Sequence, residues 1–276
     1  MNTSFTQFKK DGQISMSYPS GLRAAVLATV DSWKNFCDQP LDIKNGLPYS
    51  NNADGVGYEM KNGVGNKADR KENFDITLEG QAWLTKHGPS IKNPVALDFI
   101  QNASALIGNM KPTILDFAKQ VEEKFGLKGF ADEVSASENG YFVRFIHYFG
   151  DRGVGEETAT AHVDQSGFTL HLFESDPGLQ CLPYKGDWVD MPVSSGETVI
   201  IPAMQMQLRS VGKLRALCHR VIATPETAKN GRYSAVCFIQ LKNTPKYDKE
   251  KHGRLQEKVP GFNYDMTHAE FLKLFK

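Results

Sequence analysis

Short strand-like segments separated by turns fill the second half of the chain, and this pattern constrains the fold more than any other feature. Each segment is rich in β-branched and aromatic residues, which favour strands, and turn-forming residues separate the segments. Such spacing is typical of a jelly-roll sandwich. The predicted strands span 141–149, 168–173, 179–182, 187–189, 198–202, 217–224 and 232–241.

The first half of the chain shows helical spacing instead. In the segment 22–36, apolar residues recur every three or four positions, which predicts one amphipathic helix. Asn93 and Pro94 have the pattern of an N-cap followed by a first-turn proline, and an apolar face continues from there to about residue 125. Pro112 lies inside that face and predicts a kink or a break. The segment 46–65 is rich in Gly, Asn and Asp and predicts a loop.

Together these patterns predict a β-rich α+β protein in which helices pack on one side of a jelly-roll core. A length of 276 residues suits one large domain, 1–276. We expect an N-terminal helical and loop region at 1–140, the core at 141–242, and a C-terminal extension at 243–276. That extension ends in a helix, predicted from the capping-box pair Thr267 and Glu270.

The composition is ordinary for a globular protein, with 40% hydrophobic and 23% charged residues. The formal net charge is zero, so no global field favours nucleic acid or a membrane surface. No stretch approaches the roughly 18 apolar residues of a membrane-spanning helix. The segment 1–10 lacks the apolar centre of a secretory signal. The cysteines are few and scattered, which predicts reduced thiols in a cytoplasmic protein.

Three motifs in the strand-rich half carry the chemistry. In an extended segment, residues two apart point the same way, so His162 and Asp164 present an imidazole and a carboxylate to one side. His219, from a distant strand, can complete a set of two histidines and one carboxylate, the donor set of non-heme Fe(II) oxygenases. Arg232 and Ser234 follow in a further strand.

With these motifs in place, the stretch 141–241 resembles the core of the isopenicillin N synthase-like family of Fe(II)/2-oxoglutarate dioxygenases. This resemblance implies that the jelly roll is a double-stranded β-helix. The matching pieces are Ala161-His162-Val163-Asp164, Thr169-Leu170-His171-Leu172, Gly178-Leu179-Gln180, Asp187-Trp188-Val189, Gly196-Glu197-Thr198, Cys218-His219-Arg220-Val221 and Gly231-Arg232-Tyr233-Ser234.

The resemblance also implies roles for individual residues. His162, Asp164 and His219 would bind Fe(II). Arg232 and Ser234 would hold the distal carboxylate of 2-oxoglutarate, a role that suits a planar guanidinium beside a hydroxyl group.

Two further residues and one segment depart from the family pattern or lie outside it. Many members carry a Tyr-Pro pair near the co-substrate, and Tyr148, which Phe149 follows here, is the predicted contact. His171 lies in an apolar strand and is predicted to be structural. The segment 203–214 departs from the family and borders the substrate side.

The implied reaction is oxidation of a C–H bond of a small organic molecule with O2 and 2-oxoglutarate. Hydroxylation is the default outcome, and desaturation or ring closure is an alternative. No nucleic-acid or membrane partner is expected, and no pattern in the sequence bears on the oligomeric state.

Several alternatives stay open from the sequence. A relative that uses ascorbate, or that oxidises its substrate directly, also carries Arg-x-Ser. A non-enzymatic metal-binding β-sandwich module and a zinc hydrolase with the same three ligands are further readings. A nucleic-acid demethylase is disfavoured, because such enzymes tend to carry a second arginine six residues after the first, and position 238 is Phe.

Overall fold

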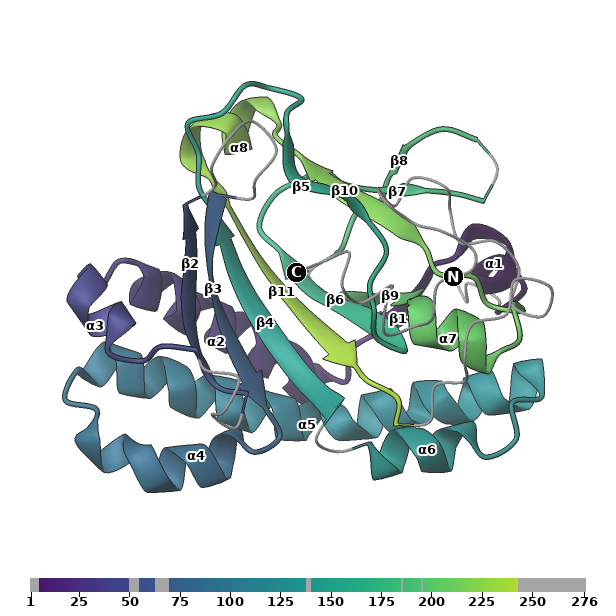
Figure 1. Cartoon of the computed structure of the whole chain (residues 1–276), viewed down its shortest axis with the longest axis horizontal. Coiled ribbons are helices and arrows are strands. Elements are labelled where there is room, and N and C mark those ends of the chain that lie inside the picture. The colour runs from purple at the N-terminus through teal and green to yellow at the C-terminus, as the bar shows by residue number, and fades with distance from the viewer. Residues whose placement is uncertain are drawn as a thin grey trace.

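A computed structural model of the protein describes residues 5–49, 55–62, 70–137, 140–184, 186–194 and 196–242. Two β-sheets form the centre of the molecule (Figure 1). The larger has seven strands in the order β1-β9-β6-β11-β4-β3-β2, and the smaller has four in the order β5-β10-β7-β8. Within both sheets, neighbouring strands pair antiparallel. The jelly-roll expectation is confirmed.

The large sheet draws strands from both halves of the chain. Its members are β1 (Ile14–Ser17), β2 (Gly57–Asn62), β3 (Arg70–Thr77), β4 (Tyr141–Tyr148), β6 (Phe168–Glu174), β9 (Glu197–Pro202) and β11 (Arg232–Ile239). The small sheet consists of β5 (Glu157–His162), β7 (Leu179–Leu182), β8 (Val189–Asp190) and β10 (Cys218–Ile222).

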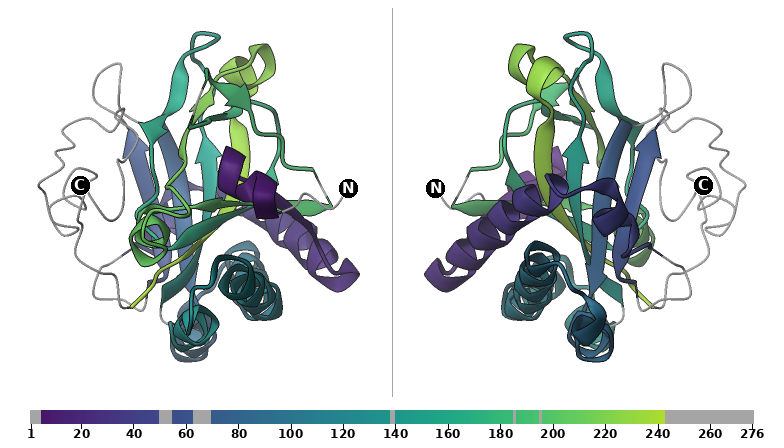
Figure 2. Two further views of the ribbon diagram at one scale, coloured as in Figure 1. Left: turned by 90° about the vertical axis from the view of Figure 1, so that its right-hand side faces the viewer. Right: turned by 90° about the vertical axis from the view of Figure 1, so that its left-hand side faces the viewer.

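Helices cover one face of the large sheet, as Figure 2 shows. Two long helices pack against each other there, α2 (Ser20–Cys37) and α5 (Pro94–Phe125). Asn93 caps α5 by accepting a hydrogen bond from the amide of Ala96 at 2.9 Å. The shorter helices are α1 (Phe5–Asp11), α3 (Leu41–Asn45), α4 (Gly80–His87), α6 (Phe130–Ala136), α7 (Met204–Arg209), α8 (Pro225–Asn230) and the 3-10 helix η1 (Gly88–Ser90).

The apolar interior has two parts. The larger lies between the helices and the sheet, where Trp33, Phe36, Phe99 and Phe145 pack with ring centroids between 5.2 and 6.2 Å apart. The smaller lies between the two sheets, and its members include residues of β4, β9 and β11 from one sheet and of β5, β7 and β10 from the other. The second cluster borders the site described below.

Parts of the N-terminal half differ from expectation. The segment 46–65 was expected to be a loop, but Gly57–Asn62 forms β2 and pairs with β3. Helix α5 runs without a break across Pro112. Gly108, the residue whose carbonyl loses its amide partner, is exposed, so that water can replace the missing hydrogen bond. The predicted C-terminal helix around Thr267 and Glu270 lies outside the described residues.

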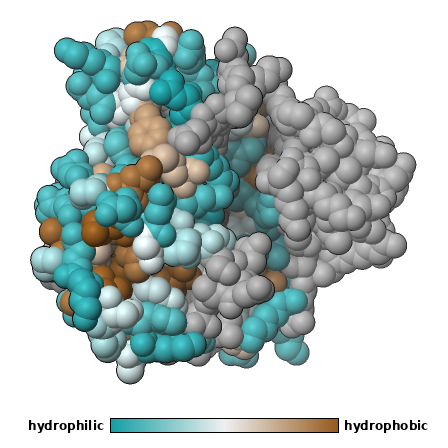
Figure 3. Space-filling view, turned by 60° about the vertical axis from the view of Figure 1, so that its left-hand side comes forward, coloured by the Kyte–Doolittle hydropathy of each residue, from teal (hydrophilic) through white to brown (hydrophobic). Residues whose placement is uncertain are grey.

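The surface seen in Figure 3 mixes polar residues with smaller apolar areas. The exposed large apolar side chains among the described residues come from separate segments: Leu41, Tyr49, Val154, Val189 and Val211. Within the described part of the chain, no helix has the length and apolar character needed to cross a membrane.

Candidate metal and co-substrate site

Three of the predicted site residues come together beside strands β5 and β10 of the small sheet. His162 is the last residue of β5, and it lies opposite His219 of β10 in the antiparallel register. Asp164 follows two residues after His162. His162 Nε2 lies 3.5 Å from Asp164 Oδ1, and His219 Nε2 lies 3.8 Å from Asp164 Oδ2. The three potential ligand atoms all lie within 4.8 Å of one another.

The hydrogen bonds around this group orient its ligand atoms. His162 Nδ1 donates to the carbonyl of Thr160 at 2.7 Å, and His219 Nδ1 donates to that of Leu217 at 3.2 Å. Each bond leaves Nε2 directed toward Asp164. Thr169 donates its hydroxyl hydrogen to Asp164 Oδ2 at 2.6 Å. Partners of this kind fix the tautomer and the orientation of metal ligands.

Electrostatics keep Asp164 and His219 in the protonation state that metals require. At His162, burial would lower the pKa, but the hydrogen bond and the charge of Asp164 raise it, so a metal competes with a proton there. Burial alone would raise the pKa of Asp164, but the electrostatic interaction with His219 and hydrogen bonds from His162 and Thr169 lower it well below its usual value. Burial lowers the pKa of His219 to about 3, and the charges of His162 and His171 act in the same direction. At neutral pH the carboxylate is therefore ionised and the buried imidazole of His219 is neutral.

The donor set fits a divalent metal. Two ligand atoms bound about 2.1 Å from one ion at right angles lie about 3 Å apart. The observed separations of 3.5 and 3.8 Å are close to that value, so only small side-chain movements are needed. Two nitrogen atoms and one carboxylate form the 2-His-1-carboxylate set of non-heme iron sites.

The predicted co-substrate residues lie on the large sheet. Arg232 and Ser234 are two apart in β11 and therefore point to the same face. Arg232 pairs across the sheet with Tyr148, the last residue of β4, and Ser234 pairs with Ile146. Tyr148 and Ile146 belong to the apolar cluster between the two sheets, so this face of β11 looks toward the small sheet.

The guanidinium of Arg232 is fully enclosed, with its side chain 2% exposed. Its Nε donates to the carbonyl of Asp176 at 3.1 Å. Nη2 lies 2.7 Å from Glu174 Oε2, but this contact lacks hydrogen-bond geometry, and in the described structure Nη1 and Nη2 have no hydrogen-bond partner. Buried donors of this kind fit an anionic ligand such as a carboxylate.

Sequence reasoning missed Glu174, and it treated His171 only as a structural residue. His171 Nδ1 lies 3.1 Å from Glu174 Oε1, and the His171 ring meets the ring of His219 edge-on at 5.6 Å. The pair therefore connects the arginine to the three-residue group. The positions are three apart in a strand, a spacing that regular alternation would place on opposite faces.

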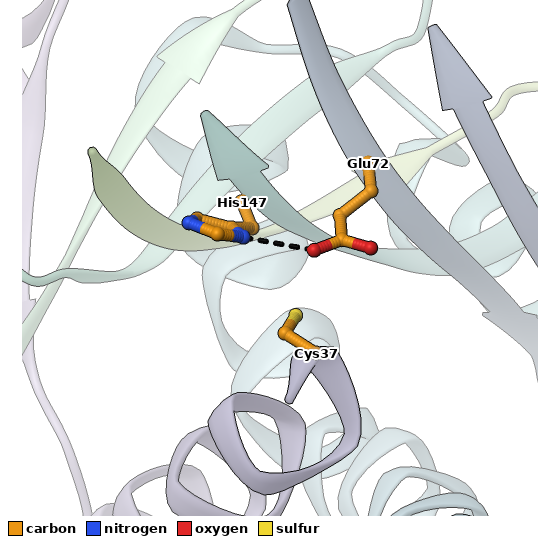
Figure 4. Close-up of side chains that lie close together, drawn as sticks. All are labelled: Cys37, Glu72 and His147. Atoms are coloured by element: carbon orange, nitrogen blue, oxygen red, sulfur yellow. Dashed lines mark hydrogen bonds and ion pairs between the residues drawn. The ribbon is translucent and has the colours of Figure 1, made fainter. Parts of the chain in front are cut away.

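A second cluster of potential ligands, Cys37, Glu72 and His147, lies on the helix side of the large sheet (Figure 4). Glu72 bonds to Lys44 Nζ at 2.7 Å, to the Tyr58 hydroxyl at 2.7 Å and to His147 Nδ1 at 2.9 Å. The carboxylate is satisfied by these bonds, and the ammonium of Lys44 would repel a metal cation. We therefore interpret this cluster as a structural network that ties α2 and α3 to the sheet.

Comparisons with known proteins agree with this geometry. The sequence profile of the 2OG-Fe(II) oxygenase superfamily matches residues 141–241. A full-length protein of Neurospora crassa, solved in complex with alpha-KG, superposes with a TM-score of 0.71 at 17% identity, covering 98% of this chain and 88% of that one. No curated protein sequence matches the chain.

Two plant structures are similar to the same extent. The dioxygenase for auxin oxidation of rice has a TM-score of 0.69 at 22% identity, covering 98% of this chain and 86% of that one. The Arabidopsis thaliana enzyme of that name, in complex with 2-oxoglutarate, has a TM-score of 0.70 at 16% identity, covering 90% and 92%. At these identities the likeness concerns the fold, and the profile match concerns the family. The profile match covers residues 141–241, and over this stretch the chain is similar to the 2OG-Fe(II) oxygenase superfamily.

Proposed function

We propose that the protein is an Fe(II)/2-oxoglutarate-dependent dioxygenase that oxidises a C–H bond of a small organic molecule, with hydroxylation as the default outcome. The observation that carries this proposal is the meeting of His162, Asp164 and His219 within 4.8 Å, on the side of the jelly roll that Arg232 also faces. Solved relatives in complex with alpha-KG or 2-oxoglutarate support the choice of co-substrate.

In this proposal the three-residue group holds Fe(II). Bound iron supplies the chemistry, since it couples the reduction of O2 to the oxidative decarboxylation of 2-oxoglutarate and to oxidation of the substrate. The chain supplies orientation. Thr160 and Leu217 hold the two imidazole rings through their carbonyls, while Thr169 holds the carboxylate. Burial of Asp164 and His219, at 7% and 5% exposure, keeps water away from two of the ligands.

The co-substrate residues act by charge and shape. Arg232 offers buried guanidinium nitrogens to the distal carboxylate of 2-oxoglutarate, and Ser234 adds a hydroxyl group from the same face of β11. Tyr148, opposite Arg232 in the neighbouring strand, borders the same space. A bidentate guanidinium–carboxylate pair fixes both position and orientation, so the 2-oxo acid end is directed toward the metal.

The proposal extends to partners and location. A small-molecule substrate is favoured over nucleic acid because the net charge is zero. In addition, Phe238, at the position of the second arginine of nucleic-acid demethylases, stacks on Phe142 with centroids 4.8 Å apart. The four cysteines are buried and form no disulfide, which supports a reducing, cytoplasmic environment. Ascorbate, in place of 2-oxoglutarate, is the alternative co-substrate.

Turnover of the co-substrate tests the proposal. The Fe(II)-loaded protein is incubated with 2-oxoglutarate and air, with and without small-molecule libraries, and succinate is measured. We expect slow succinate formation alone and faster formation with a true substrate. His219→Ala serves as the inactive control. Oxidation of a substrate without consumption of 2-oxoglutarate would favour a direct or ascorbate-dependent oxidase.

A further inference from the structure

We propose that Glu174 is a specificity residue for the co-substrate, because its carboxylate competes with the distal carboxylate of 2-oxoglutarate for Arg232. This inference rests on the proposed function, since it concerns the same pocket. It concerns a residue that lies outside the motifs of the iron and 2-oxoglutarate sites. Its consequence is that the protein binds 2-oxoglutarate more weakly than its arginine alone would allow.

The first observation is the closeness and burial of the two charges. Arg232 Nη2 and Glu174 Oε2 are 2.7 Å apart, and their side chains are 2% and 6% exposed. An enclosed guanidinium with a carboxylate at this distance has its charge balanced within the chain. A second carboxylate brought to the same guanidinium would meet the like charge of Glu174 in surroundings that screen charge poorly.

The second observation is that the pair is incompletely bonded. In the described structure, buried atoms without a hydrogen-bond partner include Glu174 Oε2, Arg232 Nη1, Arg232 Nη2 and His171 Nε2. Buried polar groups are normally bonded, and orphaned ones mark a place that a ligand or an ordered water completes. All four atoms belong to one connected group, because His171 Nδ1 contacts Glu174 Oε1 at 3.1 Å.

The third observation explains how Glu174 reaches the pocket. Between β6 and β11 the register shifts: Ala235 pairs with Phe173, but Val236 pairs with His171, which leaves Leu172 as an extra residue. A bulge of this kind reverses the alternation of side chains beyond it. His171 and Glu174 therefore share one face although they are three residues apart, while Leu172 packs into the core on the helix side.

These observations predict that Glu174 affects the binding of two 2-oxo acids of the same length differently. 2-Oxoglutarate carries a distal carboxylate and meets the competition from Glu174. 2-Oxopentanoate carries the same 2-oxo acid end but a methyl group in place of the distal carboxylate, so it does not meet that competition. Removing the charge of Glu174 should strengthen binding of 2-oxoglutarate and leave the affinity for 2-oxopentanoate unchanged.

The experiment measures anaerobic binding of both acids to the Fe(II)-loaded protein by isothermal titration calorimetry. Glu174→Gln keeps the size of the side chain and removes its charge. We expect the Kd of 2-oxoglutarate to fall about tenfold in this variant, and that of 2-oxopentanoate to stay within about twofold. Asp176→Asn is the matched control, because it removes a nearby negative charge, while the hydrogen bond from Arg232 goes to the backbone carbonyl of Asp176 and is kept. Its Kd values should match the wild type.

Each possible calorimetry result supports or excludes a specific interpretation. Unchanged or weaker 2-oxoglutarate binding in Glu174→Gln would overturn the inference, and weaker binding would mean that Glu174 positions Arg232. The proposed function would stand in both cases. If the wild type and the variant both bind Fe(II) but neither acid, the co-substrate assignment itself fails. Binding of 2-oxoglutarate by Glu174→Gln alone would support the inference in its strongest form.

Discussion

His162 and His219 lie opposite each other across β5 and β10, with ring centroids 4.4 Å apart and with Asp164 bridging their Nε2 atoms. Two histidines 57 positions apart in the sequence are thus brought together by one pair of antiparallel strands. Both rings are oriented by backbone carbonyls, and this leaves the same nitrogen of each ring available for a metal.

Removal of a ligand should abolish metal binding and leave the fold intact. We expect His219→Ala and Asp164→Ala to weaken Fe(II) binding by at least about a hundredfold, because two donors hold a metal poorly where three are needed. Anaerobic Fe(II) titration measures the affinity, and circular dichroism checks the fold. Retention of wild-type Fe(II) affinity in either folded variant would show that the residue is not a ligand.

The hydroxyl group of Thr169 should contribute to metal affinity without contacting the metal. Thr169→Val removes the hydrogen bond to Asp164 and keeps the shape of the side chain. Outer partners of metal ligands are typically worth about 10- to 100-fold in affinity. We expect Fe(II) affinity to fall about tenfold in the same titration. Thr198→Val is a control, since that buried hydroxyl donates to the backbone carbonyl of His171 rather than to a metal ligand.

Arg232 should govern co-substrate binding more than metal binding. Replacing it alone would leave the carboxylate of Glu174 buried without a counter-charge, which destabilises a protein strongly. The double variant Arg232→Gln/Glu174→Gln avoids this. We expect it to fold, to bind Fe(II) normally and to bind 2-oxoglutarate at least about tenfold more weakly than Glu174→Gln does. Equal affinities in calorimetry would remove Arg232 from the co-substrate site.

The hydrogen bonds around Glu72 make the free energy of unfolding depend on pH. Burial alone would raise the pKa of Glu72, but hydrogen bonds from His147, Lys44 and Tyr58 lower it from 4.5 to about 2. Because the folded pKa is below the unfolded one, this stabilisation is fully present above about pH 4.5 and disappears as the pH falls toward 2. Glu72→Gln should therefore lose about 3–5 kcal/mol at pH 7.

Urea unfolding at pH 7, 4 and 3 tests that prediction. The difference between wild type and Glu72→Gln should shrink as the pH falls. Asp31→Asn breaks an ion pair whose carboxylate side is 74% exposed, so it should cost less than about 1 kcal/mol at every pH. A pH-independent difference for Glu72→Gln would contradict the linkage.

Substitution of two asparagines should change the stability of the protein in different ways. Asn73 is 1% exposed, and neither of its amide atoms has a hydrogen-bond partner in the described structure. Asn73→Leu should therefore be neutral or stabilising, since an unbonded buried amide is replaced by an apolar group. Asn93→Ala should cost about 1 kcal/mol, because it removes the cap of α5. Thermal unfolding measures both, and a large loss for Asn73→Leu would reveal an unseen partner.

The sequence predicted most strands of the core, but not β5, and it predicted the residues that meet at the three-residue group. It could do so because alternation within a strand and the His-x-Asp spacing are local signals. It did not predict β2, since the Gly- and Asn-rich segment 46–65 has no strand propensity of its own, and β2 exists through its pairing with β3. The helix α7, within the segment 203–214, was also not predicted.

Glu174 shows a second reason why part of the site could not be predicted from the sequence. Its approach to Arg232 depends on the extra residue Leu172, and whether a strand accommodates such a bulge depends on its neighbour β11. Local alternation would place Glu174 on the face opposite His171. A feature that changes the chemistry of the pocket therefore depends on strand register, which a single sequence does not carry.

Anaerobic titration of the metal-free protein with Fe(II) and then 2-oxoglutarate tests the central claim most directly. Chelation of Fe(II) by a 2-oxo acid gives a weak visible charge-transfer band. We predict that the band appears with the wild type and is absent with His219→Ala. Iron binding without a band at saturating 2-oxoglutarate would contradict the co-substrate assignment, and failure to bind iron would contradict the metal site itself.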